Sequence, residues 1–151
     1  MFLKIVCLIG ITCLAACDKP PVSTDSEARQ FLEMNGIFPS RPCSIMPGPG
    51  CVSLGGIRKK TLEGVYLLKI GCKMCSTFRI TGGTEPRHSV ASPHSRGMAI
   101  DFVEAAPTNL EKLLTDVTPP SGGVYRFGIG GYWFRISREG PAPEHWHLEV
   151  D

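Results

Sequence analysis

The first sixteen residues, MFLKIVCLIGITCLAA, form an apolar run with one lysine near its start. Such a run is too short to span a bilayer as a mature helix, and it has the layout of a secretory signal peptide. It constrains the rest of the chain, because a secreted domain folds where thiols are oxidised. We therefore expect residues 1–16 to be removed and the folded domain to begin after them.

The apolar run ends in LAAC, where small residues precede Cys17. This pattern resembles the bacterial lipoprotein box, in which the cysteine is lipidated and becomes the new N-terminus. The resemblance implies a protein of the bacterial cell envelope that is anchored to the membrane through Cys17, since several acyl chains together anchor stably. Asp18 is similar to a signal for retention on the periplasmic face of the inner membrane. The alternative is an ordinary signal peptide cut after Ala16, which leaves Cys17 free.

Cleavage at this point leaves a chain of about 135 residues, the usual size of one domain with a modest core. We expect residues 17–23 to be the lipidated cysteine and a Pro-containing tether, and residues 24–151 to be a single domain. The formal net charge is +2, from 16 basic and 14 acidic residues that are well mixed. Because no basic block is present, we expect no nucleic-acid partner.

Four cysteines remain in this domain, namely Cys43, Cys51, Cys72 and Cys75. In an oxidising compartment they predict two disulfides, for which three connectivities are possible. Local pairing, Cys43 with Cys51 and Cys72 with Cys75, is the simplest. The alternative is a structural zinc site, because CKMC at 72–75 has ligand spacing, although the longer gap between Cys43 and Cys51 fits a zinc knuckle poorly.

The hydrophobic pattern predicts an α+β domain with a small, mainly antiparallel sheet and two helices. One helix is expected to begin at Thr24, which has capping-box spacing to Glu27, and to end at the Asn35-Gly36 stop signal. The other helix is expected over 108–117. Strands are expected at 65–70, 77–81, 98–103, 124–129, 132–137 and 145–150. The first two of these strands are expected to form a hairpin across the second cysteine pair.

The stretch SPHSRGMAID at 92–101 places His94 and Asp101 seven residues apart. Pro93 and Gly97 argue against one helix that carries both residues. We expect a loop with His94 to lead into a strand that carries Asp101 on its less apolar face.

The strand expected near the end of the chain, within EHWHLEV, alternates in the same way. It places His145, His147 and Glu149 on one face, and its core residues on the other. Glu149 is then either the partner of a ligand histidine or an exposed strand residue. Because zinc prefers imidazole and carboxylate ligands, His94, Asp101 and His147 could form a catalytic set with a fourth position for water.

Two motifs in this region resemble those of the zinc D-alanyl-D-alanine carboxypeptidases of the VanX and VanY type. SPHSRGMAID is similar to their Ser-x-His-x-x-Gly-x-Ala-x-Asp motif, and the matching residues are Ser92, His94, Gly97, Ala99 and Asp101. EHWH is similar to their Glu-x-Trp-His motif, and the matching residues are Glu144, Trp146 and His147. The resemblance covers residues 77–151 and does not reach the first cysteine pair.

This resemblance implies a fold of the hedgehog and D-Ala-D-Ala metallopeptidase type. It also implies Zn2+ as the cofactor, His94, Asp101 and His147 as its ligands, and Glu144 as the general base. Zinc lowers the pKa of its bound water toward about 7, which makes hydroxide available near neutral pH. His145 is a departure from the motif, and in related lysostaphin and hedgehog proteins an equivalent histidine takes part in catalysis. His145 is therefore the second candidate for the base.

A further departure concerns the residues that bind substrate. The family usually has an arginine in a Ser-Gly-Tyr-Arg segment, where it binds substrate charge. The corresponding TGGTEPRH has Glu85 at that position and Arg87 two positions later. The resemblance then implies substrate binding by Arg87 and by Ser92.

The resemblance implies a peptidase that acts on peptidoglycan stem peptides. A D-Ala-D-Ala carboxypeptidase is the first hypothesis, and a D,D- or L,D-endopeptidase is the second form of it. A binding lipoprotein that keeps the zinc and recognises cell-wall peptide without cleavage is the alternative. A third hypothesis is a structural envelope protein held by disulfides, and metal content separates it from the others.

Overall fold

The computed structural model describes residues 23–75, 77–105, 107–118, 120–129, 131–140 and 144–151. The expected signal peptide and Cys17 lie outside the described residues. None of the helices in the described part of the chain is long and apolar enough to cross a membrane.

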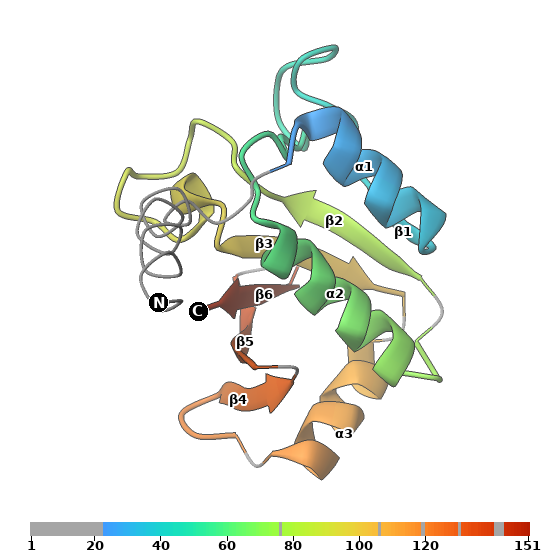
Figure 1. The fold of residues 1–151 in the computed structure, drawn as a ribbon. Helices are drawn as coiled ribbons and strands as arrows, with labels where there is room; N and C mark the ends of the chain where they lie inside the picture. The colour runs from blue at the N-terminus through green and yellow to red at the C-terminus, as the bar shows by residue number, and fades with distance from the viewer. Residues whose placement is uncertain (1–22, 76, 106, 119, 130, 141–143) are drawn as a thin grey trace, which may run out of the picture.

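Three α-helices and one short 3-10 helix are described (Figure 1): α1 (Asp25–Met34), α2 (Lys59–Gly71), η1 (His94–Arg96) and α3 (Pro107–Val117). Six strands form one sheet: β1 (Ile37–Pro39), β2 (Phe78–Gly82), β3 (Ala99–Glu104), β4 (Val124–Ile129), β5 (Tyr132–Glu139) and β6 (His145–Val150). Their order is β1-β2-β3-β6-β5-β4. The pair of β1 and β2 is parallel and the other pairs are antiparallel. The expected α+β class and mainly antiparallel sheet are confirmed, with one α-helix more than expected.

Helix α1 begins where the capping pattern predicts. The Thr24 side chain accepts a hydrogen bond from the Glu27 backbone N–H at 3.2 Å, and the Glu27 carboxylate accepts one from the Thr24 N–H at 2.9 Å. The helix ends at Asn35, and Gly36 follows with a φ of +70°. Both ends are therefore set by local backbone chemistry.

The expected strand at 65–70 and its hairpin are wrong, because these residues belong to helix α2. The run VYLLKI is rich in strand-forming residues, but it has no clean apolar and polar alternation. Thr61, Val65 and Leu68 instead recur with helical spacing and are buried together. Burial of this face outweighs the local β preference. The true neighbours of β2 are β1 and β3.

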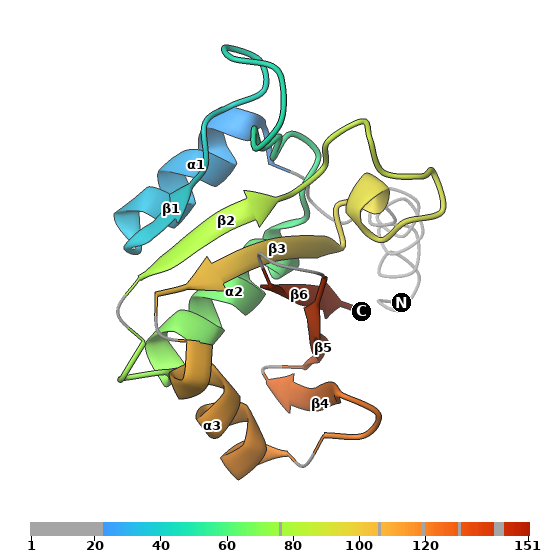
Figure 2. The same cartoon turned by 180° about the vertical axis from the view of Figure 1, so that it is seen from behind.

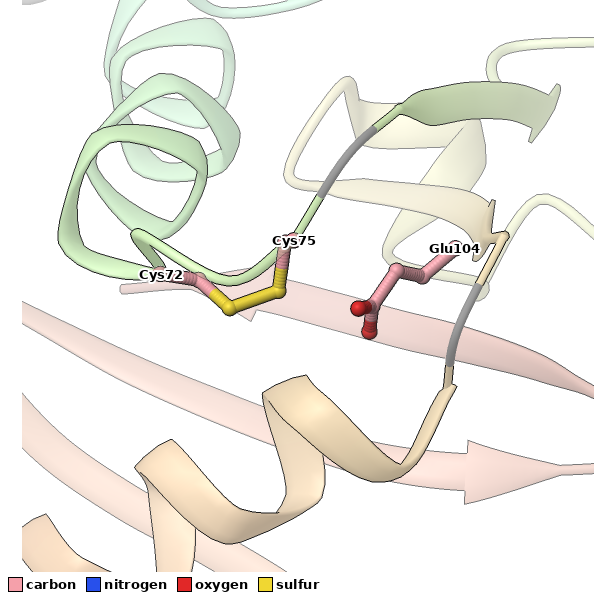
Figure 3. A group of neighbouring side chains, drawn as sticks. All are labelled: Cys72, Cys75 and Glu104. Atoms are coloured by element: carbon pink, nitrogen blue, oxygen red, sulfur yellow. A yellow bond between two sulfur atoms is a disulfide. The ribbon is translucent and has the colours of Figure 1, made fainter.

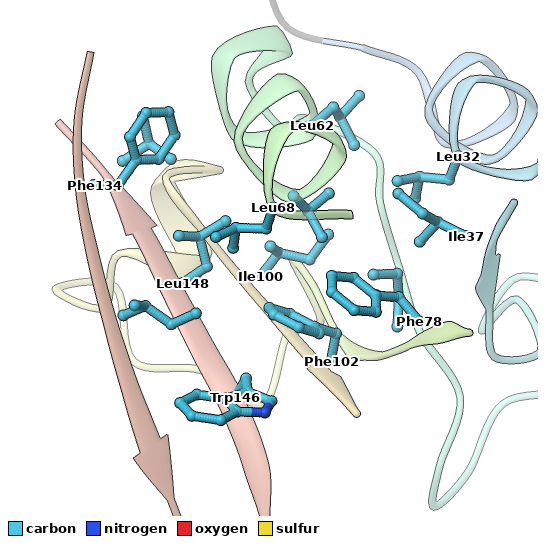
Figure 4. Packing of buried hydrophobic residues seen from close by; sticks show 14 of the residues in the cluster. Leu32, Ile37, Leu62, Leu68, Phe78, Ile100, Phe102, Phe134, Trp146 and Leu148 are labelled. Atoms are coloured by element: carbon cyan, nitrogen blue, oxygen red, sulfur yellow. The ribbon is translucent and has the colours of Figure 1, made fainter. Parts of the chain in front are cut away.

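Helix α2 packs across the middle of the sheet. It lies in front of β3 and β6 in Figure 1 and behind them in Figure 2, where the opposite face of the sheet is turned to the viewer. Its leucines Leu62 and Leu68 meet side chains of the sheet in one continuous core (Figure 4). Gly64 allows the close approach, because a Cβ at this position would overlap the Phe134 ring.

Both local disulfides are present. Cys43 pairs with Cys51, and Cys72 pairs with Cys75. The first closes an irregular loop between β1 and α2, and the second closes the turn that follows α2. The simplest of the expected connectivities is therefore confirmed.

Gly97 closes the tight turn between η1 and β3. Its φ is +67°, and a Cβ there would overlap the backbone at Gly56, Ile57 and Arg58. Its carbonyl accepts hydrogen bonds from the Arg58 N–H at 3.0 Å and from the Thr61 hydroxyl at 2.8 Å. The expected turn at this glycine is confirmed, and it attaches the His94 segment to the start of α2.

We predict that Gly97→Ala destabilises the fold more than Gly36→Ala. Gly36 has nearly the same φ, +70°, but open space where a Cβ would lie. Gly36→Ala should therefore lower the free energy of unfolding by about 1–2 kcal/mol, the cost of a left-handed backbone for an L-residue. Gly97→Ala should add the overlap with the α2 segment to that cost. Urea unfolding of both variants measures the difference, and equal losses would contradict the close packing at Gly97.

Candidate metal centre

The register of two central strands sets the position of the first two candidate ligands. In the antiparallel pair of β3 and β6, Asp101 lies directly opposite His147. Each points to the face away from the core, whereas Ile100, Phe102 and Trp146 point into it. Gly82 on β2 pairs with Asp101, and a Cβ at Gly82 would overlap the Asp101 carboxylate. The expected alternation in both strands is confirmed.

The third candidate ligand reaches the pair from η1. The ring of His94 is buried, and its Nδ1 donates a hydrogen bond to the Gly83 carbonyl at 2.8 Å. The Ser92 hydroxyl accepts a hydrogen bond from the His94 backbone N–H at 3.2 Å. The segment that was expected to be a loop is thus a single 3-10 turn with a fixed histidine.

The three candidate ligand atoms form a small triangle. His94 Nε2 lies 3.2 Å from His147 Nδ1 and 3.2 Å from Asp101 Oδ1. His147 Nδ1 lies 2.8 Å from Asp101 Oδ1. Ligand atoms about 2.0–2.1 Å from a tetrahedral zinc ion are about 3.3 Å from one another. The sides of the triangle therefore have the size that one zinc ion requires, with a fourth position left open.

Hydrogen bonds on the far side of each ring fix which nitrogen faces the triangle. The Gly83 carbonyl can only accept, so His94 Nδ1 carries the proton. The Glu149 carboxylate accepts from His147 Nε2 at 3.1 Å, so Nε2 carries the proton of that ring. In the neutral rings, His94 Nε2 and His147 Nδ1 then turn lone pairs toward each other and toward Asp101. Three lone pairs that converge repel one another unless a proton or a metal ion lies among them, and a proton on His147 Nδ1 would be donated to Asp101 Oδ1 at 2.8 Å.

The electrostatics of the site also favour one positive charge. Burial alone would raise the pKa of Asp101, but the hydrogen bonds from His147 and His94 outweigh it and hold that pKa far below its usual range. Burial would lower the pKa of His147, but the hydrogen bond with Asp101 outweighs it and raises that pKa. A proton or a metal ion can supply this charge, and both compete for the same imidazole nitrogen.

Two further groups hold the candidate ligand histidines in place. Glu149 is the partner of His147, the first of the two roles that the sequence left open. Glu85 is 4% exposed, and its carboxylate accepts hydrogen bonds from the N–H groups of Ser53 and Gly83 at 3.0 Å. It also lies 3.0 Å from Nε2 of His88, whose ring stacks on that of His94 with centroids 4.2 Å apart. The buried carboxylate of Glu85 therefore fixes Gly83, whose carbonyl accepts the hydrogen bond from His94 Nδ1.

Sequence reasoning missed the position of Glu85. Its partners come from the loop before α2 and from the residues beside it, and no local pattern shows that distant contact. The signal that could have found it was an acidic residue directly after two glycines and a threonine, because backbone N–H groups in such a turn can surround a carboxylate.

The two candidates for the general base lie in different surroundings. His145 shares the face of His147, and its Nε2 is 3.9 Å from Asp101 Oδ2. The side chain of Glu144 is 52% exposed, and its carboxylate forms an ion pair with Arg138, which also lies 3.6 Å from Glu111. The structure brings His145 to the triangle and places the Glu144 carboxylate on Arg138.

The residues expected to bind substrate lie around the triangle and do not enter it. Arg87 is 53% exposed, and its guanidinium lies 3.9 Å from the Glu85 carboxylate. Ser92 uses its hydroxyl to accept from the His94 backbone. Arg87 is therefore available at the surface, whereas Ser92 is part of the turn that holds the candidate ligand His94.

No family model, curated protein or solved structure matches this chain. The likeness of its two motifs to the zinc carboxypeptidases therefore stays an expectation, and the chemistry of the site follows from its own residues.

We predict that metal affinity falls as the pH is lowered from about 8 to about 5. A raised pKa means that His147 keeps its proton to a higher pH than an ordinary histidine, so the metal must displace that proton over more of the range. The apparent affinity should fall about tenfold per pH unit for each proton displaced. Competition with a chromophoric chelator measures it, and an affinity that does not change with pH would contradict the ligand assignment of His147.

We predict that Glu149→Gln weakens zinc binding by about tenfold, because the substitution removes the charge that orients His147 and makes it more basic. Glu63→Gln is the matched control, since Glu63 is exposed on α2. It should leave zinc affinity unchanged in the same competition assay. Equal affinities in the two variants would show that Glu149 does not support the metal ligand.

Proposed function

We propose that this protein is a zinc-dependent peptidase that acts on peptidoglycan stem peptides, with D-Ala-D-Ala carboxypeptidase activity in first place. Endopeptidase cleavage of the D,D or L,D type is the other form of the same proposal. The observation that carries it is the convergence of His94 Nε2, His147 Nδ1 and Asp101 Oδ1 within 3.2 Å of one another. Two imidazoles and one carboxylate are the donor set of a catalytic zinc site.

The fold supports the same proposal. An antiparallel sheet whose adjacent strands carry a histidine and an aspartate in register, with a second histidine in the preceding turn, suits the hedgehog and D-Ala-D-Ala metallopeptidase type that the motifs resemble. The proposed relationship rests on the motifs and on this placement of their residues.

In this proposal the chain holds one zinc ion through His94, Asp101 and His147. When bound, zinc polarises the scissile carbonyl and lowers the pKa of a bound water. Glu149 and the Gly83 carbonyl keep the two imidazoles in the required tautomers. Gly82 leaves the space that the Asp101 carboxylate occupies. These groups orient the site before substrate arrives.

A residue at the site must also take a proton from the attacking water and pass it to the departing amine. The motif assigns this role to Glu144, which would have to leave Arg138 to reach the site. His145 already faces Asp101, at 3.9 Å. On the motif we assign the proton transfer to Glu144 first, and on the geometry His145 is the second candidate; direct comparison of their variants separates them.

In this proposal, substrate recognition depends on the positive charge of Arg87 and on the position of the domain at the membrane. The stem peptide ends in a carboxylate, and the exposed guanidinium of Arg87 could bind it close to the proposed zinc ion. A lipid anchor on Cys17 would hold the domain at the membrane of the cell envelope, near its polymer substrate. The peptide substrate and the membrane are thus the two partners that we propose.

A second function is favoured by the ion pair of Glu144 with Arg138. If this pair persists with peptide bound, Glu144 stays away from the zinc ion. The protein would then be a cell-wall-binding lipoprotein that keeps zinc without cleaving peptide.

We predict that Glu144→Gln abolishes hydrolysis and leaves one zinc ion bound, whereas His94→Ala loses both. His145→Gln should reduce hydrolysis less than Glu144→Gln does. The assay is zinc content together with mass spectrometry of muropeptides incubated with the protein. Loss of a terminal D-Ala supports the carboxypeptidase, and a cut within the stem supports the endopeptidase.

Three other outcomes separate the remaining possibilities. Full activity of Glu144→Gln with loss in His145→Gln would move the base to His145. Zinc without cleavage by the unmodified protein would favour the binding lipoprotein. A protein without zinc would contradict both functions.

A further inference from the structure

A second group of residues of the types that bind metal ions lies at the other end of β3, away from the histidines. Cys72 and Cys75 close the turn after α2, and Glu104 is the last residue of β3. All three are buried, and their ligand atoms lie within 4.8 Å of one another. Figure 3 shows the Glu104 carboxylate turned toward the disulfide.

Among the described residues, one oxygen of the Glu104 carboxylate lacks a hydrogen-bond partner. The side chain is 7% exposed, and its Oε2 accepts a hydrogen bond from the Leu110 N–H in the first turns of α3 at 3.2 Å. Oε1 is buried and has no hydrogen-bond partner among the described residues. An unpaired buried polar atom costs about 1–3 kcal/mol. A buried acid with an unpaired oxygen at this position points to a partner that binds there.

We propose that reduction of the Cys72–Cys75 disulfide turns this cluster into a second metal site. Cys72 Sγ, Cys75 Sγ and Glu104 Oε1 then bind a divalent cation that prefers thiolates, and zinc is the best candidate. The oxidised protein has no such site, because both sulfurs are used in the disulfide. The site is therefore controlled by the redox state of one cysteine pair.

The chemistry needs a dithiol reductant, which is a reduced protein or a small molecule. Its thiolate attacks one sulfur of the Cys72–Cys75 bond, a mixed disulfide forms, and its second thiol closes to release the protein. Two electrons pass to the cysteines, and the reductant becomes its own disulfide. Each cysteine thiol that then binds the metal releases its proton to water. Lys73 and Met74, between the two cysteines, are exposed, so a local opening of the turn admits the reductant.

The geometry and the charge of the cluster suit such a site. Two cysteines separated by two residues have the spacing of zinc ligands, and their Cα atoms are 5.3 Å apart. Sulfurs bound to a tetrahedral zinc ion at about 2.3 Å lie about 3.8 Å from each other, which rotation about the side-chain bonds can provide. Two thiolates and one carboxylate leave a divalent ion with one negative charge in excess. The positive charge of Lys69 balances that excess. Its ammonium donates a hydrogen bond to the Cys75 carbonyl at 2.9 Å and attracts the Glu104 carboxylate electrostatically.

Cobalt titration of the mature chain, with residues 1–16 removed and Cys17 either lipidated or replaced by Cys17→Ser, tests this proposal, because thiolate bound to Co2+ gives a near-ultraviolet charge-transfer absorption that imidazole and carboxylate do not give. We expect no such band from the oxidised protein. After anaerobic reduction and removal of the reductant, we expect the band to appear with one further equivalent of Co2+ bound. Glu104→Gln should weaken the affinity that the band reports by at least about tenfold. The double variant Cys72→Ser/Cys75→Ser should abolish the band.

Two controls keep this result separate from the proposed peptidase. The double variant Cys43→Ser/Cys51→Ser removes the other disulfide and should leave the band unchanged. His94→Ala damages the histidine site and should also leave it unchanged, so failure of one site does not imply failure of the other. Three results would each overturn the proposal: no band after reduction, a band that survives the double variant Cys72→Ser/Cys75→Ser, or an affinity that Glu104→Gln does not alter.

Discussion

The convergence of His94 Nε2, His147 Nδ1 and Asp101 Oδ1 is the constraint on which the rest of this structure depends. Each of these atoms can turn a lone pair toward the other two. Asp101 and His147 face each other because β3 and β6 pair in one register, and a slip of either strand by one residue would turn its own member of this pair into the core. His94 completes the group from a turn held by Gly97. The backbone thus enforces an arrangement that is unfavourable without a positive charge, which a proton or a metal ion can supply.

The scaffold around this group is built to keep it rigid. The core side of β3 and β6 is filled by Ile100, Phe102 and Trp146, and α2 packs against that side (Figure 4). At the start of the same helix, the Arg58 N–H and the Thr61 hydroxyl donate hydrogen bonds to the Gly97 carbonyl. Packing energy from the core is therefore coupled directly to the position of His94. The buried carboxylate of Glu85 adds a second attachment through Gly83.

Local chemistry accounts for the parts of the fold and site that could be predicted from sequence. The cap of α1, the turn at Gly97, the two short disulfide loops and the alternation around Asp101 and His147 each depend on neighbouring residues. Helix α2 could not be predicted, because its run of β-branched and aromatic residues is overridden by burial against a sheet that forms far along the chain. Glu85 was missed for the same reason, since its partner Ser53 is 32 residues away. The surroundings of Glu144 depend on Arg138, a residue of the neighbouring strand.

X-ray absorption at the zinc edge of the purified, oxidised protein tests the central claim most directly, because it reports the ligands of the bound ion. The account predicts one zinc ion per chain with nitrogen and oxygen neighbours at about 2.0–2.2 Å, including the outer-ring scattering of two imidazoles. It predicts no sulfur neighbour at about 2.3 Å while the cysteines stay paired. Absence of zinc, or a first shell made of sulfur, would contradict a metal centre formed by His94, Asp101 and His147.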